Sequence, residues 1–339
     1  MSGGIHVDVD EIAAEVPLAL AAWGMAAPDR VTRVPGGTLN WNFRVEAGEG
    51  TYFLRCYRAN LETERIAGEH ELVAWVGERG VPAPVAIPMR DGGTIAVVGE
   101  RRWALLPWMA GEPVERGALS AAQARSLGAM HGRIQAVLAS HPDSDGARML
   151  MRWDKGQSLG LLDRLIAKAG ERREAKWIVE GLEMQRRMLD ATDVLPPEAF
   201  ASLPCQVLHG DFHDQQALFL GDEVSAIVDW EIWHTDPRAW ELVRSLAFSL
   251  MLTSPWREDY LAGYREHMRL TEGEVELAMR LWFQSRVVGV WAWWAYLMDG
   301  NDRVVDFFPE MMAELRRIGT EGWTDSVTER VVRASRAQR

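Results

Sequence analysis

Two side chains with complementary chemistry lie five positions apart in the stretch His209-Gly-Asp-Phe-His-Asp-Gln-Gln-Ala-Leu-Phe219. Asp211 carries a carboxylate that can accept the proton of an attacking hydroxyl, and Gln216 carries an amide oxygen that can bind a metal ion. One short loop can therefore serve a nucleophile and a negatively charged group together. The two residue types suit proton abstraction from a hydroxyl next to a metal ion.

A second carboxylate ends an apolar run, Ala226-Ile-Val-Asp-Trp-Glu231. Mg²⁺ prefers oxygen ligands and keeps waters and phosphates in its remaining positions. We therefore expect Asp229 and Gln216 to bind Mg²⁺ without a closed protein cage. The two cysteines, Cys56 and Cys205, have no paired spacing and no nearby histidine cluster, so no zinc site is expected.

Each of these residues also has an ordinary structural interpretation. Asp211 and Asp229 could be capping residues at strand ends, but two acids with these neighbours and in this order favour catalysis. His209 and His213 are interpreted as structural hydrogen-bonding groups, because Asp211 already occupies the place that faces the nucleophile.

The elements that must position these residues begin with a mixed N-terminal part. The sequence predicts a helix over 11–27, strands over 34–45 and 51–57 around a Gly48-Glu49-Gly50 turn, a helix over 62–79, a hairpin over 88–100 with its turn at Asp91-Gly-Gly93, a strand over 102–106, and a hinge over 106–111. This order of elements is typical of a small lobe built around a sheet.

The remainder of the chain has mainly helical patterns. Ser120 is expected to cap a helix that reaches Leu138, and residues 158–191 and 238–318 have largely helical patterns. The apolar runs 206–208 and 224–228 are the exception, and we expect them to form one small sheet with polar residues at its strand ends. Asp236 is expected to cap a helix, and Glu241 to lie on a solvated face.

Composition restricts the class of protein. The 339 residues suit two lobes that share a cleft, which we place at 1–106 and 107–339 in an α+β fold. The formal net charge of −12 disfavours nucleic acid and anionic membranes as partners. The apolar stretch 17–28 lacks the basic flank of a signal peptide, and 287–298 is shorter than the roughly 20 residues that span a bilayer. We therefore expect a cytoplasmic protein, either a monomer or a homodimer.

The motifs resemble those of the aminoglycoside phosphotransferase and choline kinase superfamily, H-G-D-x-x-x-x-N and [IV]-D-[WF]. The resemblance covers most of the chain, and the segments 40–45 and 53–57 are similar to homoserine-kinase-like and antibiotic-kinase members. It implies a two-lobed, protein-kinase-like α+β fold, with a sheet-rich N-terminal lobe and a larger helical lobe. It also implies that ATP or GTP binds with Mg²⁺ between the lobes.

The resemblance assigns roles to individual residues. It makes Asp211 the catalytic aspartate and Asp229 the metal aspartate, with Gln216 as a metal ligand where the family has asparagine. Arg55 stands where the family usually has a lysine that contacts phosphates, and arginine can grip phosphate oxygens in a fork. Its helix partner is Glu69, or alternatively Glu71.

The remaining assignments concern the nucleotide. Gly36 and Gly37 lie in the loop that would cover the phosphates, although this loop lacks the G-x-G-x-x-G of protein kinases. Leu106 and Trp108 lie at the hinge and are expected to contact the nucleotide. A surface salt bridge would explain Arg55 and Glu69 almost as well as a phosphate contact does.

The acceptor is the least defined part. The acidic chain favours a cationic partner, and four of its 16 tryptophans, at 282, 291, 293 and 294, line either an acceptor pocket or the core. These features predict an antibiotic-like acceptor, an aminoglycoside or a nucleoside antibiotic, whose phosphorylation would confer resistance. The alternatives are a kinase of homoserine, choline or a sugar, and an inactive nucleotide-binding regulator, which Gln216 would suit.

Overall fold

The computed structural model describes residues 9–35, 40–145 and 154–336, and the chain divides into two compact units. The first unit comprises Met1–Leu127 together with His209–Trp233, and the second comprises Gly128–Leu208 together with His234–Arg339. Each unit is thus assembled from two segments that are distant in sequence. The lobe boundary near residue 106 stays a prediction.

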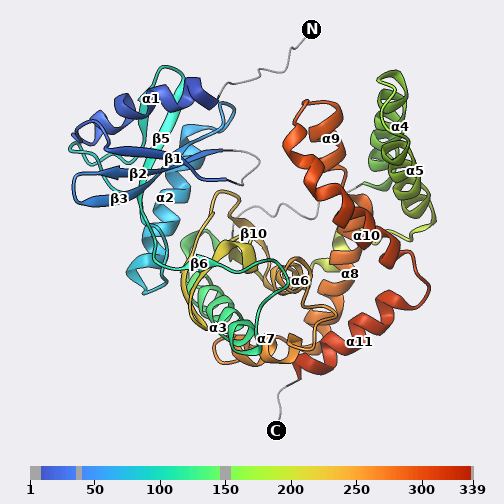
Figure 1. Ribbon diagram of the computed structural model, residues 1–339. Helices are drawn as coiled ribbons and strands as arrows, with labels where there is room; N and C mark the ends of the chain where they lie inside the picture. Colours follow the sequence, from blue (N-terminus) through green and yellow to red (C-terminus); the bar gives the residue numbers. More distant parts are fainter. Residues whose placement is uncertain (1–8, 36–39, 146–153, 337–339) are drawn as a thin grey trace. The chain divides into compact units, whose positions relative to one another are not determined.

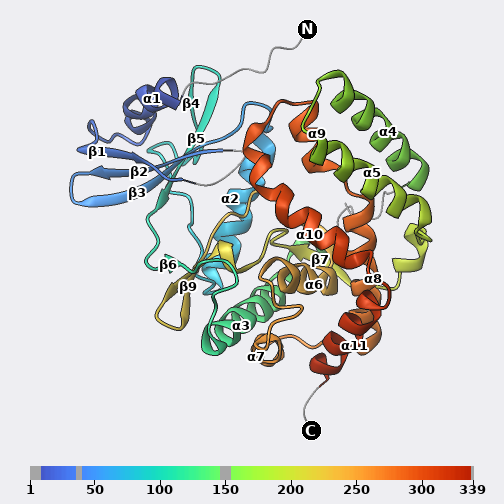
Figure 2. The ribbon, with the colours of Figure 1, turned by 45° about the vertical axis from the view of Figure 1, so that its right-hand side comes forward.

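The first unit is built on a five-stranded antiparallel sheet. Its strands are β1 (Arg30–Arg33), β2 (Trp41–Ala47), β3 (Gly50–Cys56), β4 (Ala96–Val98) and β5 (Arg101–Pro107), in the order β1-β2-β3-β5-β4. The helices α1 (Val9–Ala22) and α2 (Thr63–Glu78) lie on opposite faces of this sheet (Figures 1 and 2). The predicted strands over 51–57 and 102–106 and the helix over 62–79 are confirmed to within two residues.

Side chains of β3 alternate between the two faces of the sheet, as in any strand. Leu54 and Cys56 are buried in the core under α1, whereas Tyr57 joins a small apolar cluster with Ile66 of α2. Arg55 lies between Leu54 and Cys56 in sequence, so it points to the α2 face. The register places Arg55 beside Ala104 of β5.

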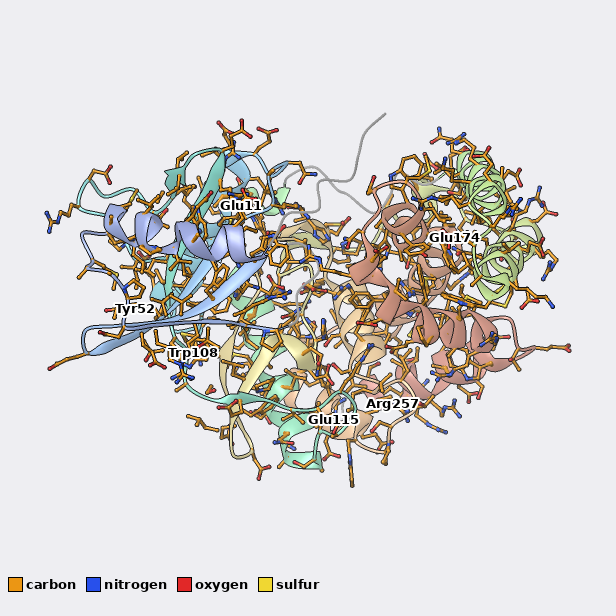
Figure 3. The ribbon with its side chains drawn as sticks, turned by 45° about the horizontal axis from the view of Figure 1, so that its top comes forward. Glu11, Tyr52, Trp108, Glu115, Glu174 and Arg257 are labelled. Atoms are coloured by element: carbon orange, nitrogen blue, oxygen red, sulfur yellow. The ribbon has the colours of Figure 1, made fainter. Side chains whose placement is uncertain are left out.

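Helix α1 is held against its face of the sheet by a polar contact as well as by the apolar core between them. Arg101 at the start of β5 pairs with Glu11 of α1, which is labelled in Figure 3, at 3.1 Å, and also with Glu15. Of the hairpin predicted over 88–100, only the second strand is confirmed, as β4. The pairing predicted around Asp91 is wrong, because residues 88–95 form no strand and β4 pairs with β5 instead.

A second, smaller sheet belongs to the first unit. It contains β6 (Glu112–Pro113), β8 (Ala217–Leu220) and β9 (Glu223–Ile227), in the order β6-β8-β9. The tight β8–β9 turn uses Gly221 with a φ of 63°, a conformation that glycine adopts without a steric penalty. The expectation of one sheet for 206–208 and 224–228 is wrong, because β7 (Cys205–Leu208) pairs with β10 (His234–Pro237) in the second unit.

The second unit is mainly helical. Its helices are α4 (Lys155–Glu171), α5 (Lys176–Ala191), α6 (Arg238–Phe248), α7 (Arg257–Tyr264), α8 (Glu272–Val288), α9 (Trp291–Leu297), α10 (Phe308–Ile318) and α11 (Trp323–Ser335), and α3 (Ala121–Leu138) is shared between the units. The largely helical pattern predicted over 158–191 is confirmed as two helices, α4 and α5, which lie side by side in Figure 2. The backbone turns at Arg173, where φ is 53°.

An apolar core joins α4, α5, α8, α9 and α10. Leu162, Leu182, Trp293 and Phe308 are buried in it, and the rings of Trp293 and Phe308 stack with centroids 4.3 Å apart. The predicted cap is also confirmed, because Ser120 Oγ accepts the backbone N–H of Gln123 at 3.1 Å. Across the described helices, none combines the length and the apolar character that crossing a membrane requires.

Candidate functional site

The segment after β7 turns sharply at Gly210, whose φ is 86°. His209 is fully buried, and its Nδ1 accepts the backbone N–H of Asp211 at 3.2 Å. Its Nε2 lies 3.0 Å from the carbonyl oxygen of Val228, which can only accept, so this nitrogen carries the proton. His209 thus joins the loop of Asp211 to the strand end before Asp229, which agrees with its interpretation as a structural residue.

The carboxylate of Asp211 is held from two sides. Gln216 Nε2 donates to Asp211 Oδ2 at 3.1 Å, and His213 Nε2 lies 3.7 Å from Oδ1. His213 Nδ1 accepts the N–H of Gln215, so in the neutral ring Nε2 carries the proton that faces Asp211. The side chain of Asp211 is 22% exposed, so an oriented carboxylate remains accessible to an incoming hydroxyl.

Gln216 and Asp229 lie at the same end of the β8–β9 hairpin. The register pairs Ala217 with Ile227, and Val228 then donates its N–H to the carbonyl oxygen of Gln216 at 2.9 Å. Because Gln216 Nε2 is used by Asp211, its amide oxygen is left for another partner. The structure therefore brings together the three residues that the sequence singled out.

Asp229 has a left-handed backbone, with a φ of 62°. Aspartate tolerates this conformation better than most residues, but a non-glycine residue there is uncommon and is held in place by its surroundings. Its side chain is 37% exposed. The backbone therefore bends at Asp229, just after the end of β9, and does not continue in the direction of that strand.

Arg55 of β3 bridges two carboxylates. Its Nη2 lies 3.1 Å from Asp229 Oδ1 and its Nη1 lies 3.4 Å from Glu69 Oε1. The alternative Glu71 is wrong, because its side chain is exposed on the other side of α2 while Glu69 is buried. A surface salt bridge is also wrong, because the Arg55 and Glu69 side chains are each only 7% exposed.

The charges in this cluster perturb one another. Burial alone would lower the pKa of Arg55, but Asp229 and Glu69 outweigh it and hold that pKa above its ordinary value. Burial raises the pKa of Glu69 to about 7; Arg55 opposes this shift, and Glu231 and Asp229 add to it. Arg55 therefore stays charged, while Glu69 titrates near neutral pH.

A chain of hydrogen bonds extends from Glu69 to the edge of the sheet. Tyr57 OH donates to Glu69 Oε2 at 3.2 Å and lies 3.0 Å from His70 Nε2, and His70 Nδ1 lies 2.7 Å from Thr94 Oγ1. Burial and Arg55 lower the pKa of His70 to about 4, so the ring is neutral at pH 7. Sequence reasoning missed Tyr57, although strand alternation from Arg55 places it on the same face.

Two of the four residues that the sequence assigns to this part of the nucleotide site lie within the described residues. Gly36 and Gly37 lie outside the described residues. Leu106 is buried on β5 opposite Phe53, so it lies on the Arg55 face. Trp108, labelled in Figure 3 with Tyr52, is 39% exposed, and its ring centroid lies 6.3 Å from that of Phe53. Nucleotide contact by Leu106 and Trp108 stays a prediction.

The donor set suits Mg²⁺ and a phosphate chain. Asp229 and Gln216 supply oxygen atoms only, and no cluster of three or more His, Cys, Asp or Glu side chains forms a metal cage in the described ranges. Arg55 Nε is a buried donor with no hydrogen-bond partner in that same part of the chain. A buried, unsatisfied guanidinium nitrogen in a side chain that pairs with the Asp229 carboxylate fits a phosphate oxygen.

A separate buried polar cluster lies in the second unit. The expectation of a solvated Glu241 is wrong: the side chain is fully buried, and its Oε2 lies 3.0 Å from Gln135 Nε2 and 3.3 Å from His131 Nε2. Asp236 is fully buried too, 3.2 Å from His234, and α6 begins without a side-chain cap. Both acids form polar contacts in the interior of the second unit, and helical periodicity does not predict that they are buried.

Curated proteins with similar sequences include homoserine kinases. The homoserine kinases of Rhizobium etli and Zymomonas mobilis subsp. mobilis are each 25% identical to the chain over 211 and 251 residues. These matches cover 61% and 70% of this chain, and 60% and 72% of the two relatives. For the first relative the match thus spans less than two thirds of its length.

Solved structures show the fold. A spectinomycin phosphotransferase, in complex with ADP and spectinomycin, has a TM-score of 0.62 at 10% identity and covers 97% of this chain and 99% of its own. An amicoumacin kinase, in complex with AMP-PNP and Ca²⁺, has a TM-score of 0.60 at 12% identity, with 95% and 96% coverage. The predicted α+β, protein-kinase-like fold is confirmed. The model of the phosphotransferase enzyme family (APH) matches residues 30–278, and the chain belongs to this family.

Proposed function

We propose that the chain is a small-molecule kinase that transfers the γ-phosphoryl group of ATP or GTP to a hydroxyl of its acceptor. The observation that carries the proposal is the arrangement in one compact unit of Asp211, Gln216, Asp229 and Arg55. A partly exposed carboxylate, two oxygen ligands and a permanent cation are the parts that phosphoryl transfer requires.

Each residue has a separate task in this proposal. Asp211, oriented by Gln216 and His213, accepts the proton of the acceptor hydroxyl as the oxygen attacks the γ-phosphorus. Asp229 and the Gln216 amide oxygen hold Mg²⁺, which when bound neutralises charge on the phosphates. Arg55 donates to the phosphate chain and keeps Asp229 in place. Most of the rate gain then comes from positioning and from charge stabilisation.

The first candidate acceptor is an antibiotic-like, ring-bearing amine. The net charge of −12 attracts cations over a distance, and Trp291 and Trp294 of the second unit are 55% and 36% exposed. Exposed indole rings can stack on sugar rings and bind amines. Trp282 and Trp293, by contrast, are buried and belong to the core.

The second candidate acceptor is homoserine, which is also an amine with a primary hydroxyl. The observation that favours it is the 25% identity to curated homoserine kinases over up to 70% of this chain. A kinetic comparison of the two acceptor classes with the same enzyme preparation separates these candidates.

The test is acceptor-dependent release of ADP or GDP by the purified protein with Mg²⁺. The panel contains aminoglycosides, nucleoside antibiotics, homoserine, choline, ethanolamine and simple sugars, and Asp211→Asn is the matched inactive control. Turnover with one acceptor, absent in Asp211→Asn, supports the proposal. Mg²⁺-dependent nucleotide binding without transfer to any acceptor would instead support the inactive regulator.

A further inference from the structure

Glu231, two residues after Asp229, belongs to a closed ring of three polar residues. Arg58 donates its backbone N–H to Asn40 Oδ1 at 3.1 Å, which fixes the orientation of that amide. Asn40 Nδ2 then donates to Glu231 Oε2, and Arg58 Nη2 lies 3.0 Å from Glu231 Oε1. The ring joins the chain before β2 and the chain after β3 to the segment that follows Asp229.

Helix α2 holds the backbone of the same segment. Arg65 Nη2 donates to the carbonyl oxygen of Glu231 at 3.1 Å and to that of Trp233, and its guanidinium lies 4.5 Å from the Trp233 ring centroid. Gly68 faces that ring so closely that a Cβ there would lie 2.9 Å from it. The Trp233 indole therefore packs against α2 at Gly68, a position without a side chain, and contacts Arg65 of the same helix.

These contacts lie where the backbone needs support. Asp229 has a strained left-handed backbone, and strain of this kind persists only where the surroundings over-determine it. On its N-terminal side Val228 bonds to Gln216 and His209. On its C-terminal side the support comes from Glu231, whose side chain is only 5% exposed. Burying a carboxylate is costly unless it is paired, and here Oε2 accepts a hydrogen bond from Asn40 while Oε1 forms an ion pair with Arg58.

We propose that Glu231 is a positioning residue that, through Asn40 and Arg58, fixes the direction in which Asp229 presents its carboxylate to Mg²⁺. This rests on the proposed function of Asp229 as a metal ligand. The two carboxylate oxygens of Glu231 face Asn40 and Arg58, so Glu231 would act on Asp229 through these contacts. Residues that orient a metal ligand typically change metal affinity by about 10–100-fold when they are removed.

The test is calorimetric binding of AMP-PNP with and without Mg²⁺, which does not depend on turnover. Glu231→Gln keeps an oxygen for Asn40 but removes the charge that Arg58 pairs with. We expect it to weaken Mg²⁺–AMP-PNP binding about tenfold and to leave binding of metal-free AMP-PNP within about twofold. Glu15→Gln is the matched control, because Glu15 also pairs with an arginine in the first unit but lies on the α1 face.

A double-mutant cycle separates positioning from direct contact. If Glu231 acts through the ring, Arg58→Met should weaken Mg²⁺–AMP-PNP binding by a similar factor, and the double variant should be no weaker than either single one. Additive losses would mean that Glu231 acts independently of Arg58, and the proposal would be wrong. Glu231→Gln binding with wild-type affinity would also overturn it while the proposed function stands, whereas a wild-type chain that binds no Mg²⁺–AMP-PNP would overturn both.

Discussion

Glu69→Gln should make the stability of the fold less dependent on pH, because the pKa of the Glu69 carboxyl is about 7 in the folded chain. In the unfolded chain it titrates near its ordinary value of 4.5. Between these values the unfolded chain loses the proton while the folded chain keeps it, so wild-type stability falls as the pH rises. The contribution is fully present below pH 4.5 and is lost above pH 7. At about 1.4 kcal/mol per unit of pKa difference, it amounts to about 3 kcal/mol.

The measurement is urea unfolding followed by tryptophan fluorescence, from pH 4.5 to pH 8. Glutamine does not titrate, so the free energy of unfolding of Glu69→Gln minus that of the wild type should rise by about 3 kcal/mol across this range. Glu71→Gln is the matched control for removing a glutamate from this helix, because Glu71 is exposed and lies two residues away. A flat difference for Glu69→Gln would show that Glu69 is ionised throughout, with Arg55 dominating burial.

Three further predictions concern the site. Asp211→Asn should lower kcat by at least about 100-fold while AMP-PNP binding by calorimetry stays within a few-fold, because the base acts on the acceptor; near wild-type turnover would contradict this role. Asp229→Ala should raise the Kd of Mg²⁺–AMP-PNP by at least about tenfold, and an unchanged Kd would exclude it as a metal ligand. Gln216→Asn keeps the ligand atom on a shorter side chain, so kcat should stay within about tenfold; complete loss of activity in a folded protein would mean that the loop requires glutamine.

Short-range sequence patterns predicted which residues could carry chemistry better than they predicted which residues contact one another. The spacing of Asp211 and Gln216, and the apolar run before Asp229, identified residues that the structure brings together, because a tight loop and a strand end are local features. The choice between Glu69 and Glu71 could not be made from the sequence, since both lie on α2 and only its packing against the sheet buries one of them.

Long-range pairing accounts for the remaining differences. The runs 206–208 and 224–228 look alike as strands, but the first pairs with the distant β10 and the second pairs with β8 across the tight turn at Gly221, and neither run carries a signal that identifies its partner. The contacts of Glu231 could not be predicted either, because nothing in Asp-Trp-Glu231 indicates a ring that closes through Asn40 and Arg58. Such partners are set by tertiary structure.

The assembly of the first unit from two distant segments has a consequence for biosynthesis. The ribosome synthesises Arg55 long before Asp229, on the order of ten seconds earlier at usual rates of elongation. During that interval the buried guanidinium lacks its nearest counter-charge, and Arg58 lacks Glu231. We therefore expect nascent chains stalled before residue 209 to be digested rapidly by protease within their first 127 residues, and chains stalled well after residue 233 to resist, so that this part of the protein matures late although it is made first.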